Sequence, residues 1–175
     1  GGPLTARLRM LVVLLSATLA QATVCSEFRI AGVGVELMLL VTILAGFHGG
    51  PERGAIVAFC AGLLYDSVTT APLGLHALVF PPIAVAVSSL ESRMLRSTLA
   101  TDALGVGAAV AAGVAAVAAV GEIFGQSSFD SGTLGERALV SALLTTGVAA
   151  PVNRLMAWAA AAGLPVAIEL RRDQG

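Results

Sequence analysis

Four ionisable side chains lie inside or beside long apolar segments, and they are the residues best placed to do chemistry: Glu36, Asp66, His76 and Glu122. A carboxylate at the centre of a bilayer costs about 2.5–3.5 kcal/mol on insertion scales, so such acids usually face the protein interior. The four residues could line a pocket for a small molecule, fix the packing of neighbouring helices or meet a partner. The alternative is that each acid caps a helix end, pairs with an arginine or reaches the membrane interface, and that His76 is a hydrogen-bonded interface residue.

The sequence contains none of the common catalytic patterns. It has no His-Glu-x-x-His, no Gly-x-Ser-x-Gly and no phosphate-binding loop. Its two histidines, His48 and His76, are predicted on opposite faces of a membrane and so cannot share a metal ion. Cys25 and Cys60 are predicted at different depths, which indicates neither a disulfide nor a metal cluster. We therefore expect a protein that is not an enzyme and that holds no metal or cofactor.

The composition is that of a membrane protein. Hydrophobic residues make up 57% of the chain and charged residues only 12%, with a mean hydropathy of +0.90. Soluble domains carry about 25% charged residues, roughly twice this share. All ten basic residues are arginines, without a basic run or interleaved aromatic residues, so nucleic acid is not an expected partner.

The apolar segments predict an all-α membrane domain over residues 1–175, with short loops and six transmembrane helices. A helix needs about 20 mostly apolar residues to cross a bilayer. The first segment ends near Ala20-Gln21-Ala22, which resembles a signal-peptide cleavage site, and we favour an uncleaved helix there. The predicted spans are 8–24, 31–47, 54–68, 75–90, 102–124 and 138–156, followed by an interfacial tail over 157–175.

The arginines predict the orientation of these spans, since cytoplasmic loops carry the excess of basic residues. With the N-terminus inside, eight arginines lie at or inside the inner boundary and only Arg29 and Arg137 lie outside, so both termini are predicted to be cytoplasmic. Asp66 then lies about 18 Å from the inner edge, at 1.5 Å per residue from Gly54, in the outer half of the membrane. Glu36, His76 and Glu122 are predicted at the same level.

Two further patterns concern helix packing. Small residues recur every four positions in the fifth span, which lets helix backbones approach closely in lipid. That row serves internal packing or, alternatively, docks a transmembrane helix of a partner. In the fourth span, Pro81 and Pro82 remove two backbone donors and predict a structural kink or, alternatively, a break that lines a ligand site. The row in the fifth span consists of Gly105, Ala109, Gly113, Val117 and Gly121.

The most specific sequence pattern between residues 36 and 90 is a Gly-Leu-Leu-x-Asp segment followed by a Pro-Leu-Gly-Leu turn. It belongs to a set of four segments: Glu36-Leu-Met-Leu-Leu-Val, Gly50-Pro-Glu-Arg-Gly54, Ala61-Gly62-Leu63-Leu64-Tyr65-Asp66 and Pro72-Leu73-Gly74-Leu75-His76-Ala77-Leu78. Together these segments resemble the MreD family of rod shape-determining membrane proteins.

The resemblance implies a non-catalytic, multi-pass scaffold in the bacterial inner (plasma) membrane, where it would serve cell elongation and peptidoglycan synthesis. MreD-like proteins partner MreC and, through it, MreB, RodA and a class B penicillin-binding protein. Glu36 and the segment from Gly62 to His76 would then shape a helix-packing elbow that helps to hold MreC. The family is also similar to the six-helix S components of vitamin-uptake transporters, so the alternative function is that of a small-molecule-binding transport subunit.

Overall fold

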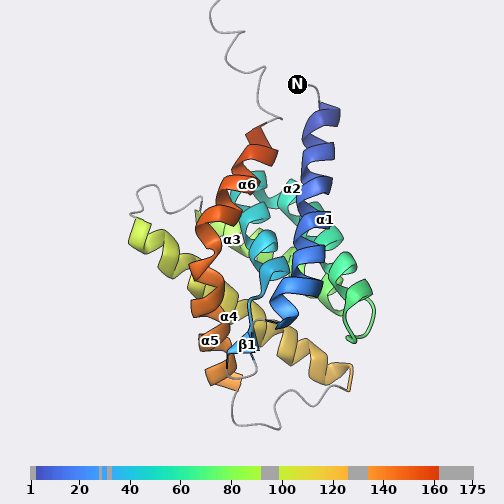
Figure 1. Ribbon diagram of the computed structural model, residues 1–175, viewed down its shortest axis with the longest axis vertical. Helices are drawn as coiled ribbons and strands as arrows, with labels where there is room; N and C mark the ends of the chain where they lie inside the picture. The colour runs from blue at the N-terminus through green and yellow to red at the C-terminus, as the bar shows by residue number, and fades with distance from the viewer. Residues whose placement is uncertain (1–2, 28, 31–32, 92–98, 126–133, 162–175) are drawn as a thin grey trace, which may run out of the picture.

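The computed structural model describes residues 3–27, 29–30, 33–91, 99–125 and 134–161. Six helices account for most of these residues, so the predicted all-α fold is confirmed (Figure 1). A two-residue antiparallel ladder follows the first helix and pairs Arg29 with Gly34 and Ile30 with Val33. The elements are α1 (Pro3–Glu27), β1 (Arg29–Ile30), β2 (Val33–Gly34), α2 (Leu37–Val68), α3 (Leu75–Glu91), α4 (Leu99–Ile123), α5 (Leu134–Gly147) and α6 (Ala149–Ala161).

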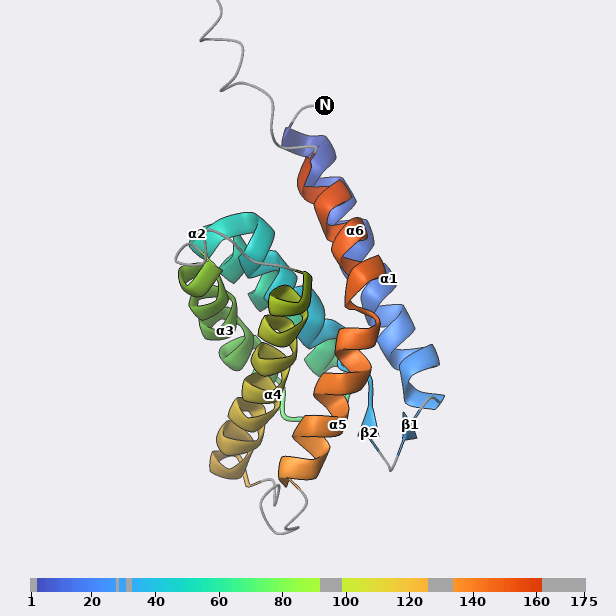
Figure 2. The same cartoon turned by 90° about the vertical axis from the view of Figure 1, so that its left-hand side faces the viewer.

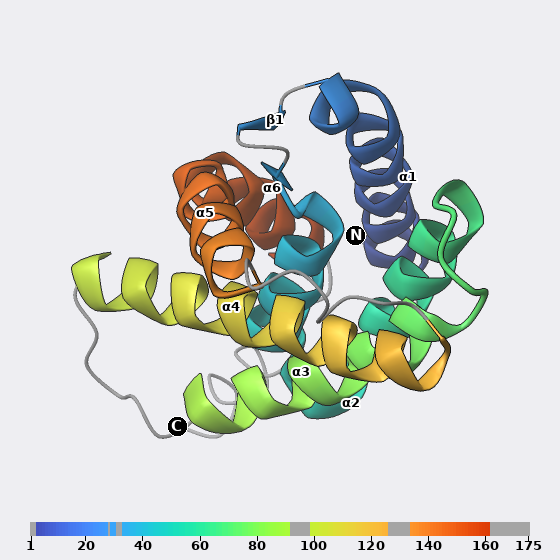
Figure 3. The same cartoon turned by 90° about the horizontal axis from the view of Figure 1, so that it is seen from below.

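The first half of α2 is the centre of the fold. Nine consecutive residues, 38–46, are buried there, which means that neighbours cover this helix on every side. A helix that is apolar all round is suited to such a place. It contacts α1, α3, α4 and α6, and Figure 3 shows it surrounded by them.

The helix α2 consists of two helical halves that meet at a sharp break. Gly50 has φ 72° and ψ −178°, a conformation that a residue with a side chain rarely adopts. Pro51 follows and opens the second half, where its missing N–H and fixed φ are tolerated. The break separates the two segments that the sequence predicts as spans 31–47 and 54–68.

The start of α2 differs from the predicted span. Val33 and Gly34 belong to β2, and the helix begins only at Leu37, six residues after the predicted start at 31. The glycines at 32 and 34 explain the difference, because glycine disfavours a helix interior by about 1 kcal/mol relative to alanine.

The predicted span 138–156 is also interrupted, because α5 ends at Gly147 and α6 starts at Ala149 with a bend of 60° between them. Pro151 lies in the first turn of α6 and has no N–H to donate to the carbonyl of Gly147, so a hydrogen bond that would join α5 to α6 in one helix is missing here. By contrast, α3 continues as one helix from Leu75 to Glu91 with Pro81 and Pro82 inside it.

Two described helices are long and apolar enough to cross a membrane, Leu4–Thr23 within α1 and Ala103–Ile123 within α4. The bent pair α5 and α6 raises this to three if it forms a broken span, and α3 contains a shorter apolar helix, Leu75–Leu90. The pairs α1–α6 and α4–α5 contact each other, and α4 also contacts α3 (Figure 2).

Candidate functional site

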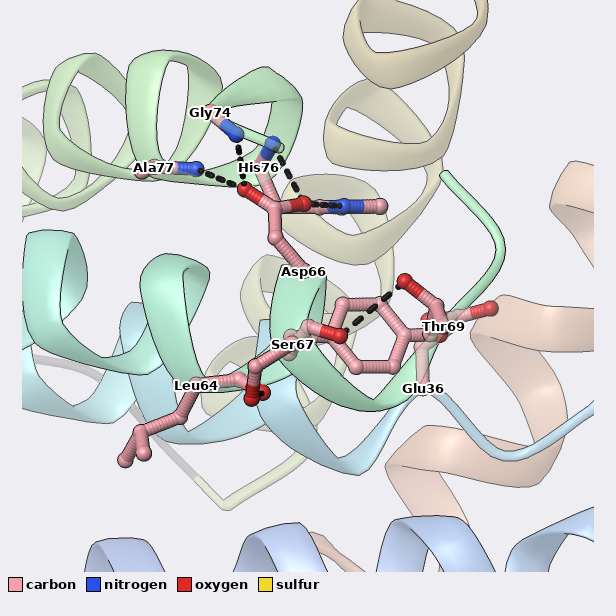
Figure 4. Close-up of polar contacts among 9 residues, drawn as sticks. Glu36, Leu64, Asp66, Ser67, Thr69, Gly74, His76 and Ala77 are labelled. Atoms are coloured by element: carbon pink, nitrogen blue, oxygen red, sulfur yellow. Dashed lines mark hydrogen bonds and ion pairs between the residues drawn. The ribbon is translucent and has the colours of Figure 1, made fainter. Parts of the chain in front are cut away.

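Asp66 lies in the last turn of α2, and its carboxylate is fully enclosed between α2 and the start of α3 (Figure 4). One oxygen, Oδ2, accepts hydrogen bonds from the backbone N–H groups of Gly74 at 2.9 Å and Ala77 at 3.3 Å. The other, Oδ1, accepts from the backbone N–H of His76 at 3.2 Å and from its ring Nδ1 at 2.6 Å. Four donors therefore converge on one carboxylate.

These contacts make Asp66 the cap of α3. The first N–H groups of a helix have no partner within it, and a side-chain oxygen at the residue before the helix normally accepts from one of them. Gly74 occupies that position and has no side chain. Asp66 supplies the missing acceptor from the preceding helix, and its negative charge also suits the positive end of the helix dipole.

His76 completes the cap and links it to aromatic neighbours. Since the carboxylate can only accept, Nδ1 of His76 carries the proton in this hydrogen bond. The imidazole meets the rings of Tyr65 and Phe80 edge to face, at centroid distances of 4.5 and 5.3 Å. The ring is mostly enclosed, with 10% of its side chain exposed.

The turn between α2 and α3 has its own backbone requirements. Gly74 has φ +98°, in the region that favours glycine, and its carbonyl accepts from the N–H of Leu78 at 2.9 Å. The N–H of Leu75 donates to the carbonyl of Pro72 at 3.1 Å. Thr69 ends α2 by donating both its N–H and its hydroxyl to the carbonyl of Tyr65.

Gly62 allows the two helices to approach. A Cβ atom at this position would lie 2.5 Å from the backbone nitrogen of Ala77, closer than real Cβ contacts come. Gly62 lies one turn before Asp66 on the same face of α2, so both residues face the first turn of α3. Leu63 and Leu73 are exposed instead, Leu73 by 75%, and Pro72 is half-buried. We call residues 62–77 the elbow.

Glu36 lies beside the elbow. Its carboxylate accepts a hydrogen bond from the hydroxyl of Tyr65 at 3.4 Å, and Tyr65 in turn contacts His76 (Figure 4). The structure therefore brings Glu36, Asp66 and His76 into one neighbourhood, which their predicted common depth allows but does not by itself require. Glu122 lies exposed in the last turn of α4.

The start of α2 is capped by other helices as well, through residues that the sequence analysis missed. The N–H of Glu36 donates to Oγ1 of Thr145 in α5 at 3.0 Å. The N–H of Leu37 donates to Oε1 of Gln21 in α1 at 2.7 Å, and Nε2 of Gln21 donates to the carbonyl of Val35 at 3.0 Å. No local motif marks Thr145 or Gln21, so only their polar type inside apolar segments could have indicated them.

The row of small residues in α4 faces the core along part of its length. Gly113 lies against the side chain of Leu39, Ala109 packs against the core, and Gly121 is buried. Gly105 faces open space, with nothing within 4 Å of an added Cβ. Internal packing thus explains the middle of the row but not its first member.

The fold and the elbow define a class of protein: an all-helical membrane protein whose buried polar groups join its own helices. A family model described as rod shape-determining protein MreD matches residues 4–120, about two thirds of the chain. The chain therefore belongs to the MreD family of rod shape-determining membrane proteins, and the resemblance seen in the sequence is confirmed. No curated protein and no solved structure matches the chain.

Proposed function

We propose that this protein is a non-catalytic scaffold of the bacterial cell-elongation machinery and that it binds MreC in the inner membrane. Family membership supports this role. The observation that carries it is the use of the Asp66 carboxylate, whose four described contacts all go to the neighbouring turn and helix of its own chain. A buried acid that caps a helix serves the architecture of a scaffold.

The proposal includes six membrane crossings with both termini in the cytoplasm. The crossings would be α1, the two halves of α2, α3, α4 and the bent pair α5 and α6. The arginine distribution supports this orientation, with eight on the inner side and two outside. Arg9 in α1 and Trp158 in α6 contact each other, which is consistent with the start of α1 and the end of α6 lying at one membrane face.

For the contact with MreC, we propose the exposed apolar side of the elbow. Leu63 and Leu73 in the elbow, and Leu78 directly after it, are exposed by 48%, 75% and 60%. They surround a turn whose shape is fixed by the Asp66 cap, and a rigid apolar ridge suits a partner's transmembrane helix and adjoining segment. Binding would depend on side-chain packing with little reorganisation of the elbow.

Co-purification tests this proposal. The full chain and MreC are co-expressed and isolated in mild detergent through a tag on one partner, and a stable complex is expected. Leu73→Ala should lower the retained MreC by about fivefold, which corresponds to about 1 kcal/mol, because the truncation removes methyl and methylene groups that the partner would bury at about 0.8 kcal/mol each. Leu104→Ala is the matched control, because Leu104 is also 75% exposed but lies on α4.

Two results would contradict the proposal at different levels. If both proteins accumulate well and no complex forms, the chain is not an MreC scaffold. If the complex forms and Leu73→Ala and Leu104→Ala retain MreC equally well, the chain binds MreC through another surface.

A further inference from the structure

A pair of arginines beside the single tryptophan lies far from the elbow, on the seam between α1 and α6. Cζ of Arg9 lies 4.6 Å from the centre of the Trp158 ring. Arg154 lies one helical turn before Trp158 on the same face of α6, where neighbouring Cβ atoms are about 5–6 Å apart. Figures 1 and 2 show α1 and α6 side by side along this seam. We call Arg9, Arg154 and Trp158 the seam cluster.

The described part of the chain offers the seam cluster no acidic partner. No carboxylate there forms an ion pair with Arg9 or Arg154. Arg154 is exposed, Arg9 is partly exposed, and half of the Trp158 side chain is exposed. Two guanidinium groups and an indole are thus available to a ligand at one place.

The chemistry of these groups favours a phosphate. A guanidinium that stacks on an indole keeps its N–H edge free, and this planar edge matches two oxygens of a phosphate. Arg154, one helical turn before Trp158, brings a second guanidinium to the same face of α6, where it can share the negative charge. Tryptophan itself is enriched at the level of lipid headgroups.

The surroundings favour a lipid over free phosphate. Exposed leucines lie next to two members of the cluster in sequence: Leu8 beside Arg9 is exposed by 64%, and Leu155 beside Arg154 is exposed by 54%. A free phosphate would bury none of this apolar surface, whereas the acyl chains of a phospholipid would cover it. Basic sites between membrane helices bind acidic headgroups in this way.

We propose that the seam cluster is a binding site for an anionic phospholipid, with the headgroup phosphate held between Arg9 and Arg154 and the acyl chains along the exposed leucines. The bound lipid would join the start of α1 to the end of α6. Arg9 and Trp158, at these two places, are 149 positions apart in the sequence. This site is independent of MreC binding and can exist whether or not the scaffold role is correct.

The tryptophan makes the site directly observable, because the chain contains only one. The full chain is reconstituted into vesicles of mixed phosphatidylglycerol and phosphatidylcholine. Either lipid is supplied in brominated form at the same mole fraction, and quenching of Trp158 fluorescence reports which lipid lies against the ring. Brominated phosphatidylglycerol should compete for the site at least about fivefold better than brominated phosphatidylcholine, since each guanidinium near an anionic headgroup adds about this factor.

Variants and salt test the assigned residues. The preference is the ratio of Trp158 quenching by brominated phosphatidylglycerol to that by brominated phosphatidylcholine. The double variant Arg9→Gln, Arg154→Gln should bring this ratio close to one, and Arg9→Lys should leave it between one and the value of the unchanged protein. Arg137→Gln, an exposed arginine of α5, should keep the full preference. High salt should lower the preference of the unchanged protein, a measurement that needs no variant.

Three outcomes would overturn the proposal. Equal quenching by both brominated lipids in the unchanged protein would show that the cluster does not select an acidic headgroup. A preference that survives in the double variant would place the selection elsewhere. If soluble glycerol phosphate displaces the brominated anionic lipid completely, the site recognises phosphate without the apolar part of the lipid.

Discussion

Replacing Asp66 tests whether one carboxylate holds the elbow together. Asparagine keeps a single acceptor oxygen in place of two. If that oxygen replaces Oδ2, the N–H groups of Gly74 and Ala77 keep their acceptor. The new NH₂ group then faces His76, where it can donate to Nδ1 if the ring proton moves to Nε2, but the backbone N–H of His76 loses its acceptor.

The magnitude follows from these four hydrogen bonds. A bond to a charged group contributes about 1.5–3 kcal/mol and a neutral one about 0.5–1.5 kcal/mol. Asp66→Asn loses one bond and weakens the others, so we expect the free energy of unfolding to fall by about 2–3 kcal/mol. Asp66→Ala leaves four donors without their acceptor, at about 1–3 kcal/mol each, so a loss of at least about 4 kcal/mol is expected.

The measurement is unfolding of the purified protein in mixed micelles with increasing dodecyl sulfate, followed by far-ultraviolet circular dichroism. Glu52→Gln is the control, because Glu52 also belongs to α2 but is exposed. A surface change of this kind should stay within about 0.5 kcal/mol of the unchanged protein. Folded Asp66→Asn protein should still retain MreC, since the proposed contact lies on the exposed side of the elbow.

The reasoning is refuted if Asp66→Ala is as stable as the unchanged protein to within about 1 kcal/mol. It also fails if Glu52→Gln destabilises as much as Asp66→Asn. Normal stability of Asp66→Asn combined with loss of MreC would move the role of Asp66 from the fold to the partner contact.

Three other changes probe the elbow and the topology. Gly62→Ala should lower the unfolding midpoint by overpacking that costs about 1–3 kcal/mol, because the added methyl meets the backbone of Ala77, while Gly105→Ala, in open space, should leave it unchanged or raise it. In a double-mutant cycle, Gly62→Ala and Asp66→Asn should couple by more than about 0.5 kcal/mol, and additive losses would show that they act independently. A reporter that works only in the cytoplasm should be active when it is fused at Gly175. Activity of a reporter that works only outside the cytoplasm would reverse the proposed orientation.

The sequence predicts the helical class well, because apolar runs separated by polar turns specify membrane-like helices. The break at Gly50 and Pro51 and the turn at Pro72 to Gly74 both fall where glycine and proline mark them. The predicted common level of Glu36, Asp66 and His76 also agrees with the contacts that join them through Tyr65. Depth along a helix can be counted from sequence, and here it was informative.

Other features have no local signal. The contact between Arg9 and Trp158 joins the two ends of the described chain. The caps at the start of α2 come from Gln21 in α1 and Thr145 in α5, so neither of them belongs to α2 itself. Hydrophobicity also could not show the bend at residue 148, because both α5 and α6 are apolar. Pro151 is visible in the sequence, but proline is tolerated in the first turn of a helix and disrupts a helix only in its interior, so its effect depends on where the helix starts.

The elbow explains why its motif has the spacing that it has. Gly62 and Asp66 are four residues apart, so they lie one above the other on a single face of α2. The missing side chain of Gly62 lets the first turn of α3 come into backbone contact, and that proximity brings Asp66 within hydrogen-bonding distance of the unpaired N–H groups. Glycine suits position 74 for two reasons. Its φ is positive, and α3 needs no capping side chain at this position because the carboxylate of Asp66 supplies the acceptor. The glycine, the acid and the turn therefore act as one unit, and each of them has its effect only because the other two are present.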